Sequence, residues 1–388
     1  MSYLRLVLIA GFAMFSMFFG SGNLVFPLLT GVQSQGHFGL AAIGLLITGV
    51  VVPFIGLLAM IYYSGNRALF LKALGGPMAL FLTFSMLGLL GPFAVVPRCA
   101  IVAQGSLSLL WSQIPPFLLN AAFCVITLIL AWKRSKIIDI IGRILTPGLL
   151  LGIFILIGFG LFMGPPPLDG TMLPSKALTC GIIEGYKTMD LLAAFFFSAS
   201  TVAYIASALK THADKQNLER LSLNACLIGA FLLGLVYIGF VALGAKYAPV
   251  LHHVDPEKLL VVIAQHSLGA LALPLASLVI ALACLTTATI LTSLFADFFY
   301  TEILKEKLSR HSVLVGTIVI SYIISLAGFT LLGHWIEIVL AFAYPALIVY
   351  TISAIVANKT GYDLRRFLFW VTLGTTVLIK IAVTMGLF

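Results

Sequence analysis

One stretch near the N-terminus combines residues that break a helix with groups that could bind a ligand. Residues 18–27 read Phe-Phe-Gly-Ser-Gly-Asn-Leu-Val-Phe-Pro and lie near the middle of the first long apolar segment. Glycine and asparagine lower the cost of leaving helical geometry, and Pro27 has no backbone N–H to donate. Inside a bilayer, freed backbone groups are tolerated only where protein or a water-filled cavity satisfies them. The stretch therefore indicates a binding site in a broken membrane helix, although close helix packing at small residues would also explain it.

Hydroxyl side chains cluster in two later apolar segments. Ser198, Ser200 and Thr201 follow a run of phenylalanines, and Thr286 and Thr287 stand side by side. Each cluster alone is explained by hydroxyls that bond to their own helix or by packing between helices. Together with carbonyls exposed by the first break, the adjacent threonines predict a monovalent-cation site, because hard cations take oxygen ligands. The serine cluster predicts a second broken helix.

A zwitterion with an apolar side chain would fit these parts. Its carboxylate would meet N–H groups where the second half of the first span begins, the positive end of a half-helix. Its ammonium would meet carbonyls and hydroxyls near residues 198–201. Aromatic residues would wall the apolar part, although core packing also explains them: Phe18, Phe19, Phe196, Phe197. The expected substrate-binding residues are Phe19, Gly20, Ser21, Gly22, Asn23, Phe197, Ser198, Ala199 and Ser200.

Charged residues inside apolar segments are functional candidates by default. Arg98 lies deep in the third apolar segment, and its expected partner is Glu337 or Asp190, each placed at the outer end of a span. A structural ion pair and an outer gate explain this set equally well. The middles of the first, sixth and eighth spans contain no Asp, Glu, His or Lys. Proton coupling normally needs a titratable group, so Na⁺ is favoured over H⁺, and an uncoupled carrier remains open.

The composition places these residues in a membrane protein. Of 388 residues, 61% are hydrophobic and only 9% are charged, and apolar runs long enough to span a bilayer recur along the chain. Nothing resembles a nucleic-acid-binding module or a cleavable signal peptide. The scattered cysteines do not suggest a disulfide framework. We therefore predict one all-α polytopic transmembrane domain over residues 1–388.

Apolar length predicts about eleven spans. They cover residues 4–33 (broken), 39–62, 77–110, 114–132, 138–163, 189–209 (broken), 217–245, 270–298, 312–330, 335–357 and 367–386. The second break comes five spans after the first, which predicts two inverted repeats, spans 1–5 over residues 1–163 and spans 6–10 over residues 189–357. Residues 358–388 would add one further span. Residues 164–188 are expected to form the longest outer loop, and a short surface helix is expected in residues 246–269.

Basic residues orient these spans, because cytoplasmic loops carry an excess of Lys and Arg. With the N-terminus in the cytoplasm, the outer loops carry few basic residues, and the C-terminus lies outside. The inner loops then carry Arg67, Lys72, Lys133, Arg134, Lys136, Arg143, Lys210, Lys215, Arg220, Lys305, Lys307, Arg310, Lys359, Arg365 and Arg366.

Four motifs together resemble one family, the branched-chain amino acid:cation symporters (LIVCS, BrnQ-type). The first-span motif is residues 19–27, the third-span motif Pro97-Arg98, the sixth-span entry residues 185–193 and the eighth-span motif residues 283–288. The chain departs from the family pattern at Cys99, where threonine is common, and at Ser198, where glycine is expected.

The resemblance implies a fold similar to the LeuT-type sodium symporters of the APC superfamily. It implies a Na⁺ site made by the carbonyls of Ser16, Phe19 and Ala283 and the hydroxyls of Thr286 and Thr287. Asn23 and Ser198 stand where some relatives hold a second cation.

The expected activity is therefore Na⁺-coupled import of leucine, isoleucine and valine by alternating access, in a bacterial inner membrane. The expected partners are the amino acid and the lipid bilayer, with no nucleic acid and an open oligomeric state. Methionine or another neutral amino acid, coupling to H⁺, and a channel remain alternatives. No catalytic constellation indicates an enzyme.

Overall fold

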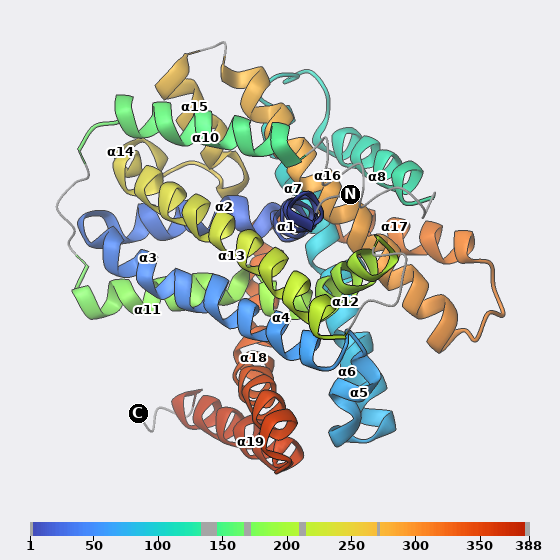
Figure 1. Cartoon of the computed structure of the whole chain (residues 1–388). Coiled ribbons are helices and arrows are strands. Elements are labelled where there is room, and N and C mark those ends of the chain that lie inside the picture. Colours follow the sequence, from blue (N-terminus) through green and yellow to red (C-terminus); the bar gives the residue numbers. More distant parts are fainter. Residues whose placement is uncertain (1–2, 133–145, 167–171, 209–214, 270–271, 385–388) are drawn as a thin grey trace.

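The computed structural model describes residues 3–132, 146–166, 172–208, 215–269 and 272–384. Every regular element in this part of the chain is helical (Figure 1). The first half contains α1 (Tyr3–Phe18), α2 (Ser21–Ser34), η1 (Gln35–His37), α3 (Phe38–Leu46), η2 (Ile47–Val51), α4 (Val52–Tyr62), α5 (Arg67–Leu71), η3 (Lys72–Leu74), α6 (Gly76–Gly88), η4 (Leu89–Phe93), α7 (Val95–Leu107), α8 (Pro116–Trp132) and α10 (Thr146–Met163).

The second half is helical in the same way. It contains α11 (Pro174–Lys187), α12 (Asp190–Ala208), α13 (Lys215–Lys246), α14 (Ala248–Leu251), η6 (Pro256–Lys258), α15 (Leu259–Leu268), α16 (Ala272–Phe298), η7 (Phe299–Ile303), α17 (Arg310–Ser325), α18 (Phe329–Thr360) and α19 (Arg365–Thr384). The short helix expected in residues 246–269 is present as η6 and α15, but the expected surface position is wrong for α15, because Leu259, Leu260 and Val261 are buried. The expected outer loop is wrong over α11, because residues 174–187 form a helix.

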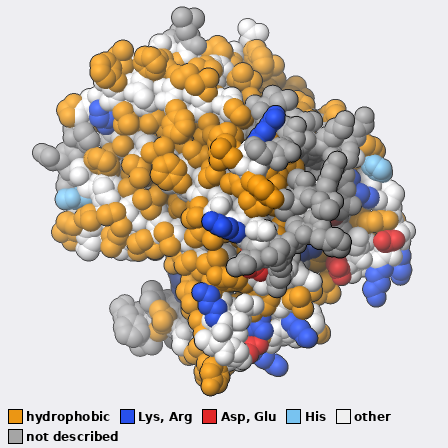
Figure 2. All heavy atoms as spheres, viewed as in Figure 1, with side chains coloured by type: hydrophobic (Ala, Val, Ile, Leu, Met, Phe, Trp, Pro, Cys, Tyr) orange, Lys and Arg blue, Asp and Glu red, His pale blue; other side chains and the backbone are white. Residues whose placement is uncertain are grey.

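Long apolar helices confirm a multi-pass membrane protein. Seven helical segments in the described residues are long and apolar enough to cross a bilayer, and shorter apolar helices accompany them. Figure 2 shows hydrophobic side chains over much of the visible face, as a lipid-facing surface requires. Phe162, Phe231 and Leu151 are among the large hydrophobic side chains that are exposed in the described residues. The count of eleven stays a prediction, and basic residues in 133–145 and 209–214 lie outside the described residues.

The packing of the helices repeats between the two halves. Helix α13 packs along both α1 and α2, while α3 and α4 pack along α11 and α12 (Figure 1). Each broken span is therefore flanked by the helix that follows its counterpart in the other half. This exchange is what inverted repeats produce, although the predicted repeat boundaries remain predictions.

Small residues allow the closest of these contacts. Gly31 of α2 lies against the backbone of α13, and Gly181 of α11 lies against the Ala41 carbonyl of α3. A Cβ at either glycine would overlap these backbone atoms. Membrane helices associate largely through such close packing, because lipid supplies no hydrophobic driving force between them.

We expect Gly181→Ala to destabilise the protein by about 1–3 kcal/mol, because the added methyl group must push α3 and α11 apart. The measurement is the thermal midpoint of the detergent-purified protein. Gly316→Ala in α17 is the matched control, since a Cβ there meets no atom within 4 Å. Equal midpoints for the two variants would contradict this packing.

Candidate functional site

The first span breaks where the sequence predicts. Helix α1 ends at Phe18, and α2 begins at Ser21 after Gly20, whose backbone is extended (φ −118°, ψ −157°). The side-chain oxygen of Asn23 accepts a hydrogen bond from the Gly20 N–H at 3.3 Å. Pro27 lies inside α2 and cannot donate to the Asn23 carbonyl. The break thus leaves backbone groups of α1 and α2 facing neighbouring helices.

The second break lies at Met189, before the predicted range of 198–201. The break expected at 198–201 is wrong, because α12 runs without interruption from Asp190 to Ala208. The chain leaves helical geometry at Met189 instead, which has φ +63° between α11 and α12. A positive φ is uncommon for a residue other than glycine, so the surrounding structure must impose it. Ser198, Ala199 and Ser200 therefore lie within a regular helix.

A buried polar cluster joins the two breaks. The Asn23 amide donates to the Asp190 carboxylate at 2.8 Å, and the Tyr237 hydroxyl of α13 donates to the same oxygen at 2.8 Å. The Asn23 amide also contacts the Tyr237 hydroxyl. All three residues are at most 2% exposed. Buried carboxyl groups need such partners, so this cluster holds both broken spans in one place.

The position of Asp190 overturns one argument from the sequence. Asp190 was expected at the outer end of the sixth span, but it starts α12 directly beside the break in the first span. The site therefore contains a titratable carboxyl group. The absence of such a group cannot be used to favour Na⁺ over H⁺.

Arg98 lies beside the same cluster, but not with its expected partners. Its Nε donates to the Ser21 hydroxyl at 3.2 Å, and its Nη1 donates to the Lys187 carbonyl at 3.0 Å. The guanidinium carbon lies 5.0 Å from the centre of the Phe26 ring. A Cβ at Gly22 would come within 2.6 Å of Arg98 Nη2, so glycine admits the guanidinium here. The predicted ion pair of Arg98 with Glu337 or Asp190 is therefore wrong, because neither pair forms among the described residues.

Lys187 connects the expected gate residues instead. Its carbonyl accepts from Arg98, and its ammonium lies 2.9 Å from the Glu184 carboxylate and 3.2 Å from the Glu337 carboxylate. Glu337 belongs to α18, and its side chain is half exposed. The end of α11 is thus tied to both α7 and α18.

Oxygen atoms of α1 and α16 approach each other at the end of α1, just before the first break. The Thr287 hydroxyl lies 3.4 Å from the Ser16 carbonyl and 3.3 Å from the Met17 carbonyl. Thr286 donates to the Ala283 carbonyl at 2.9 Å. The Ser16 hydroxyl is buried without a hydrogen-bond partner in the described part of the chain. Distances above the usual 2.7–2.8 Å of O–H···O bonds and an orphaned hydroxyl fit a site that holds a cation.

A small cavity of about 10 Å³ lies between these groups. It has room for about one water molecule. Of the predicted residues, the cavity lining includes Gly20, Ser21, Gly22, Asn23, Phe197, Arg98, Asp190 and Thr287. It does not include Phe19, Ser198, Ala199, Ser200, Ser16, Ala283, Thr286 or Glu337. In this conformation the site is closed around its polar groups.

Three residues that bring polar groups to the site were missed, as were the apolar lining residues Leu90, Val95, Ala193 and Leu291. Tyr237 donates a hydrogen bond to Asp190, Thr188 lines the cavity, and the Met17 carbonyl faces the Thr287 hydroxyl. A tyrosine in an otherwise apolar span was the one signal that could have indicated Tyr237, because a buried hydroxyl needs a partner. Thr188 and Met17 carry no signal that separates them from neighbouring residues.

Comparison with solved structures identifies the fold. The chain aligns over 97% of its length with Mhp1, a nucleobase-cation-symport-1 family transporter, in a closed conformation (TM-score 0.65, 14% identity, 93% of that chain). It also aligns over 97% with MhsT in complex with L-phenylalanine (TM-score 0.63, 15% identity, 98% of that chain). The chain therefore has the LeuT-type fold of membrane transporters.

Sequence comparison defines the family. The family model described as branched-chain amino acid transport protein matches residues 4–387, and the chain belongs to this family. It is 32% identical to the branched-chain amino acid transport system 3 carrier protein of Pseudomonas aeruginosa, over 89% of this chain and 79% of that protein. It is 30% identical to the branched-chain amino acid permease BrnQ of Bacillus subtilis, over 88% and 79%. These relatives are named as transport proteins, which indicates a transporter rather than an enzyme.

Proposed function

We propose that this protein imports leucine, isoleucine and valine by Na⁺-coupled symport with alternating access. The observation that carries the proposal is the meeting of both helix breaks at Asn23, Asp190 and Tyr237, beside the Thr287 contact with α1. Family membership and the names of the relatives support the substrate class. The oxygen atoms between α1 and α16 support the coupling ion.

The cavity offers complementary groups for a zwitterion. Ser21 and Gly22 begin α2, whose N-terminal N–H groups favour a carboxylate, and Arg98 adds a positive charge beside them. Asp190 supplies a negative charge for the ammonium. The side chain would lie against the apolar part of the lining, which includes Leu90, Val95, Phe197 and Leu291.

The proposed Na⁺ ligands are the ones that the family resemblance implies. The carbonyls of Ser16, Phe19 and Ala283 and the hydroxyls of Thr286 and Thr287 would hold the ion, and the approach of Thr287 to α1 supports this set and adds the Met17 carbonyl as a further candidate. Bound there, Na⁺ supplies a positive charge that attracts oxygens of both α1 and α16. Neutral oxygen ligands suit a weakly held ion.

The closed cavity implies that substrate enters only after a rearrangement. The contacts of Lys187 with Arg98 and Glu337 lie on the outer side in the orientation that we propose, with the N-terminus in the cytoplasm and the C-terminus outside a bacterial inner membrane. Outward opening would separate α11 from α18 and break the Lys187–Glu337 pair. Partly exposed pairs of this kind are worth about 1 kcal/mol or less, so they can open readily.

Coupling to H⁺ is a second candidate that one observation favours. Asp190 is a buried carboxyl group at the meeting point of the two breaks, and such groups commonly carry protons in transporters. Transport of methionine or another neutral amino acid through the same cavity remains a variant of the proposal.

The test is uptake of labelled leucine into proteoliposomes with an inward Na⁺ gradient, compared with a matched K⁺ gradient at constant pH. We expect saturable uptake that depends on Na⁺ and is inhibited by isoleucine and valine. Uptake driven only by a pH gradient would show that the coupling ion is H⁺ and not Na⁺. A lack of saturation and counterflow would indicate a channel and would overturn the proposal.

A further inference from the structure

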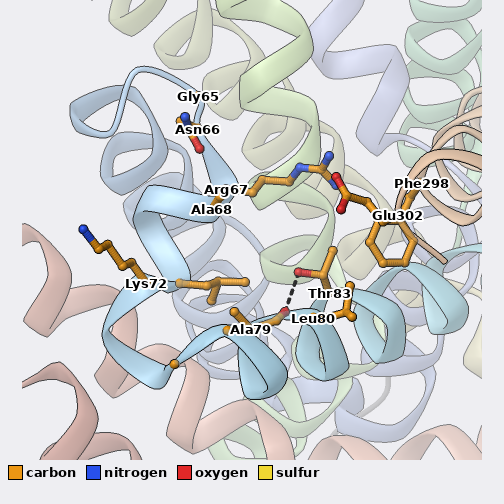
Figure 3. A pocket seen from close by; sticks show the side chains of 13 residues that line it. Gly65, Asn66, Arg67, Ala68, Lys72, Ala79, Leu80, Thr83, Phe298 and Glu302 are labelled. Atoms are coloured by element: carbon orange, nitrogen blue, oxygen red, sulfur yellow. Dashed lines mark hydrogen bonds between the residues drawn. The ribbon is translucent and has the colours of Figure 1, made fainter. Parts of the chain in front are cut away.

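A second, larger cavity lies at the end of the molecule that carries Arg67, Lys72 and the α16–α17 connection. Its volume is about 510 Å³, within the roughly 300–1,000 Å³ range of small-molecule pockets. Segments distant in sequence form its walls, namely α5, the start of α6 and the end of α16 with η7 (Figure 3). In the proposed orientation this cavity opens to the cytoplasm.

Opposite charges and apolar surface stand together in this cavity. The Arg67 side chain points toward the Glu302 carboxylate, while Lys72 points away from both (Figure 3). Ala79, Leu80 and Phe298 supply apolar surface next to this pair. A cation, an anion and an apolar wall are the three features that an apolar amino acid requires.

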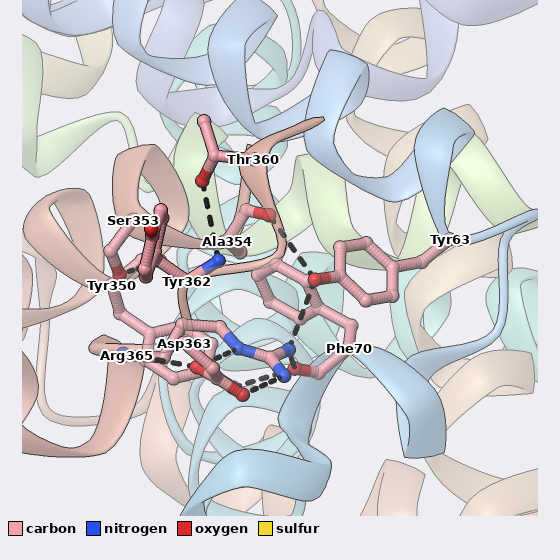
Figure 4. A network of polar contacts seen from close by, with 9 residues as sticks. All are labelled: Tyr63, Phe70, Tyr350, Ser353, Ala354, Thr360, Tyr362, Asp363 and Arg365. Carbon is pink, nitrogen blue, oxygen red and sulfur yellow. Dashed lines mark hydrogen bonds and ion pairs between the residues drawn. The ribbon is translucent and has the colours of Figure 1, made fainter. Parts of the chain in front are cut away.

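The helix that presents Arg67 is fixed in place. The Phe70 carbonyl of α5 accepts from the Tyr350 hydroxyl at 2.6 Å and from Arg365 Nη1 at 3.1 Å (Figure 4). Arg365 also binds Asp363 through two nitrogens, and these hydrogen bonds hold the pKa of the Asp363 carboxyl below its usual range. The network therefore stays charged at neutral pH. These hydrogen bonds attach α5 to α18 and α19 and so fix the position of the cavity wall that α5 forms.

Packing of α5 reaches the transport site. The Phe70 ring lies 5.1 Å from the Phe195 ring, and the Arg67 guanidinium carbon lies 5.3 Å from the centre of the Phe196 ring. The next residue on α12, Phe197, lines the small cavity at the two helix breaks, which we call the central cavity. One short segment of α12 thus separates the two cavities.

Two helical segments, α16 and α6 with η4, contribute residues to both cavities. Along α16, Leu291 lines the central cavity, and Phe298, seven residues later, lines the larger one. Leu90 of η4 lines the central cavity, and Thr83 of α6, seven residues earlier, lines the larger one. Seven residues are two helical turns, so the cavities lie roughly 10 Å apart along these helices. Phe295 lies between Leu291 and Phe298 on the same face and packs against Gly91. The cavities are therefore stacked along one path that is closed between them.

We propose that the larger cavity is a second binding site for the transported zwitterion, which the amino acid occupies after it leaves the central site. Arg67 binds the carboxylate, Glu302 binds the ammonium, and the side chain lies against Ala79, Leu80 and Phe298. The ligand class rests on the proposed function. Because the site lies on the cytoplasmic side of the closed path, it affects the affinity for internal amino acid and not for external amino acid.

The test compares both sides of the membrane on the same protein. Right-side-out vesicles are loaded with graded concentrations of leucine, and the half-saturating internal concentration is measured from exchange with labelled external leucine. We expect Arg67→Gln and Glu302→Gln each to raise this internal value about tenfold, with the external value changed less than about twofold. Lys307→Gln and Glu306→Gln are matched controls, since each removes one charge nearby and neither residue lines the cavity.

A labelling experiment gives a readout that does not require transport. In inside-out vesicles, leucine should slow the reaction of an Ala79→Cys variant with a membrane-impermeant maleimide about fivefold, and a Lys307→Cys variant should not be protected. Adding Arg67→Gln should abolish the protection.

The outcomes separate this inference from the proposed function. Wild-type exchange with unchanged internal constants in both variants overturns the second site alone. An equal rise of internal and external constants assigns the effect to the central site or to folding, and it also overturns the second site. A wild-type protein that exchanges no amino acid overturns the proposed function and this site together.

Discussion

Asp190→Asn is expected to lower the rate of leucine uptake at least about 100-fold. One oxygen of the carboxylate accepts hydrogen bonds from both Asn23 and Tyr237, and an amide in its place loses the negative charge that strengthens both bonds. Hydrogen bonds to charged groups contribute about 1.5–3 kcal/mol each, and a loss of about 3 kcal/mol corresponds to a factor of about 100. The measurement is initial uptake at saturating leucine, normalised to the amount of folded protein.

The control for this variant is Asp255→Asn, which removes one carboxylate from an exposed pair with Lys258. Exposed pairs of this kind contribute little, so its uptake should match the wild type. If Asp190→Asn took up leucine at the wild-type rate, the proposed role of the Asp190 carboxylate in transport would be wrong. A variant that exchanges leucine but no longer accumulates it would assign Asp190 to energy coupling, which is the result expected for H⁺ symport.

Thr287→Ala is expected to raise the Na⁺ concentration for half-maximal leucine uptake about tenfold or more. The Thr287 hydroxyl is the α16 oxygen that approaches the α1 carbonyls of Ser16 and Met17, and alanine removes it. Thr287→Ser keeps the hydroxyl and should stay close to the wild type. The measurement is initial uptake as a function of Na⁺ concentration at constant ionic strength.

Thr317→Ala is the matched control, because the buried Thr317 hydroxyl bonds only within α17, to the Val313 carbonyl at 2.8 Å. Its Na⁺ dependence should be unchanged. Thr286→Ala should give a smaller shift than Thr287→Ala, since Thr286 donates to the Ala283 carbonyl of its own helix. Unchanged Na⁺ dependence in both Thr286→Ala and Thr287→Ala would contradict the assigned ion site.

Part of the site followed directly from local residue types. The break at Phe19 and Gly20 was predictable because glycine and asparagine make a break inexpensive and Pro27 removes a helical hydrogen bond. The pairing of Thr287 with the first span was expected from the carbonyls that the break exposes and from the family resemblance, although a threonine hydroxyl could also bond within its own helix. These predictions required no knowledge of how the remaining helices pack.

The second break was misplaced for a physical reason. Ser198 and Ser200 suggested irregular backbone, but a hydroxyl in a helix can bond to its own preceding turn, as Ser200 does with the Phe196 carbonyl. Met189, where the chain does leave helical geometry, has no local preference for a positive φ. The contacts of α11 and α12 with α3, α4 and α2 hold it there. No pattern in the sequence records that strain.

The sequence by itself determined the class of the protein, a helical membrane protein of one transporter family, because apolar length and local motifs are properties of adjacent residues. It also determined the first helix break and the oxygen-rich segments. Only the tertiary structure decided that Asp190 belongs to the centre of the site, that Tyr237 accompanies it and that Lys187 stands between Arg98 and Glu337. Those contacts join residues that are distant in the chain, so they depend on how the two broken spans pack against each other.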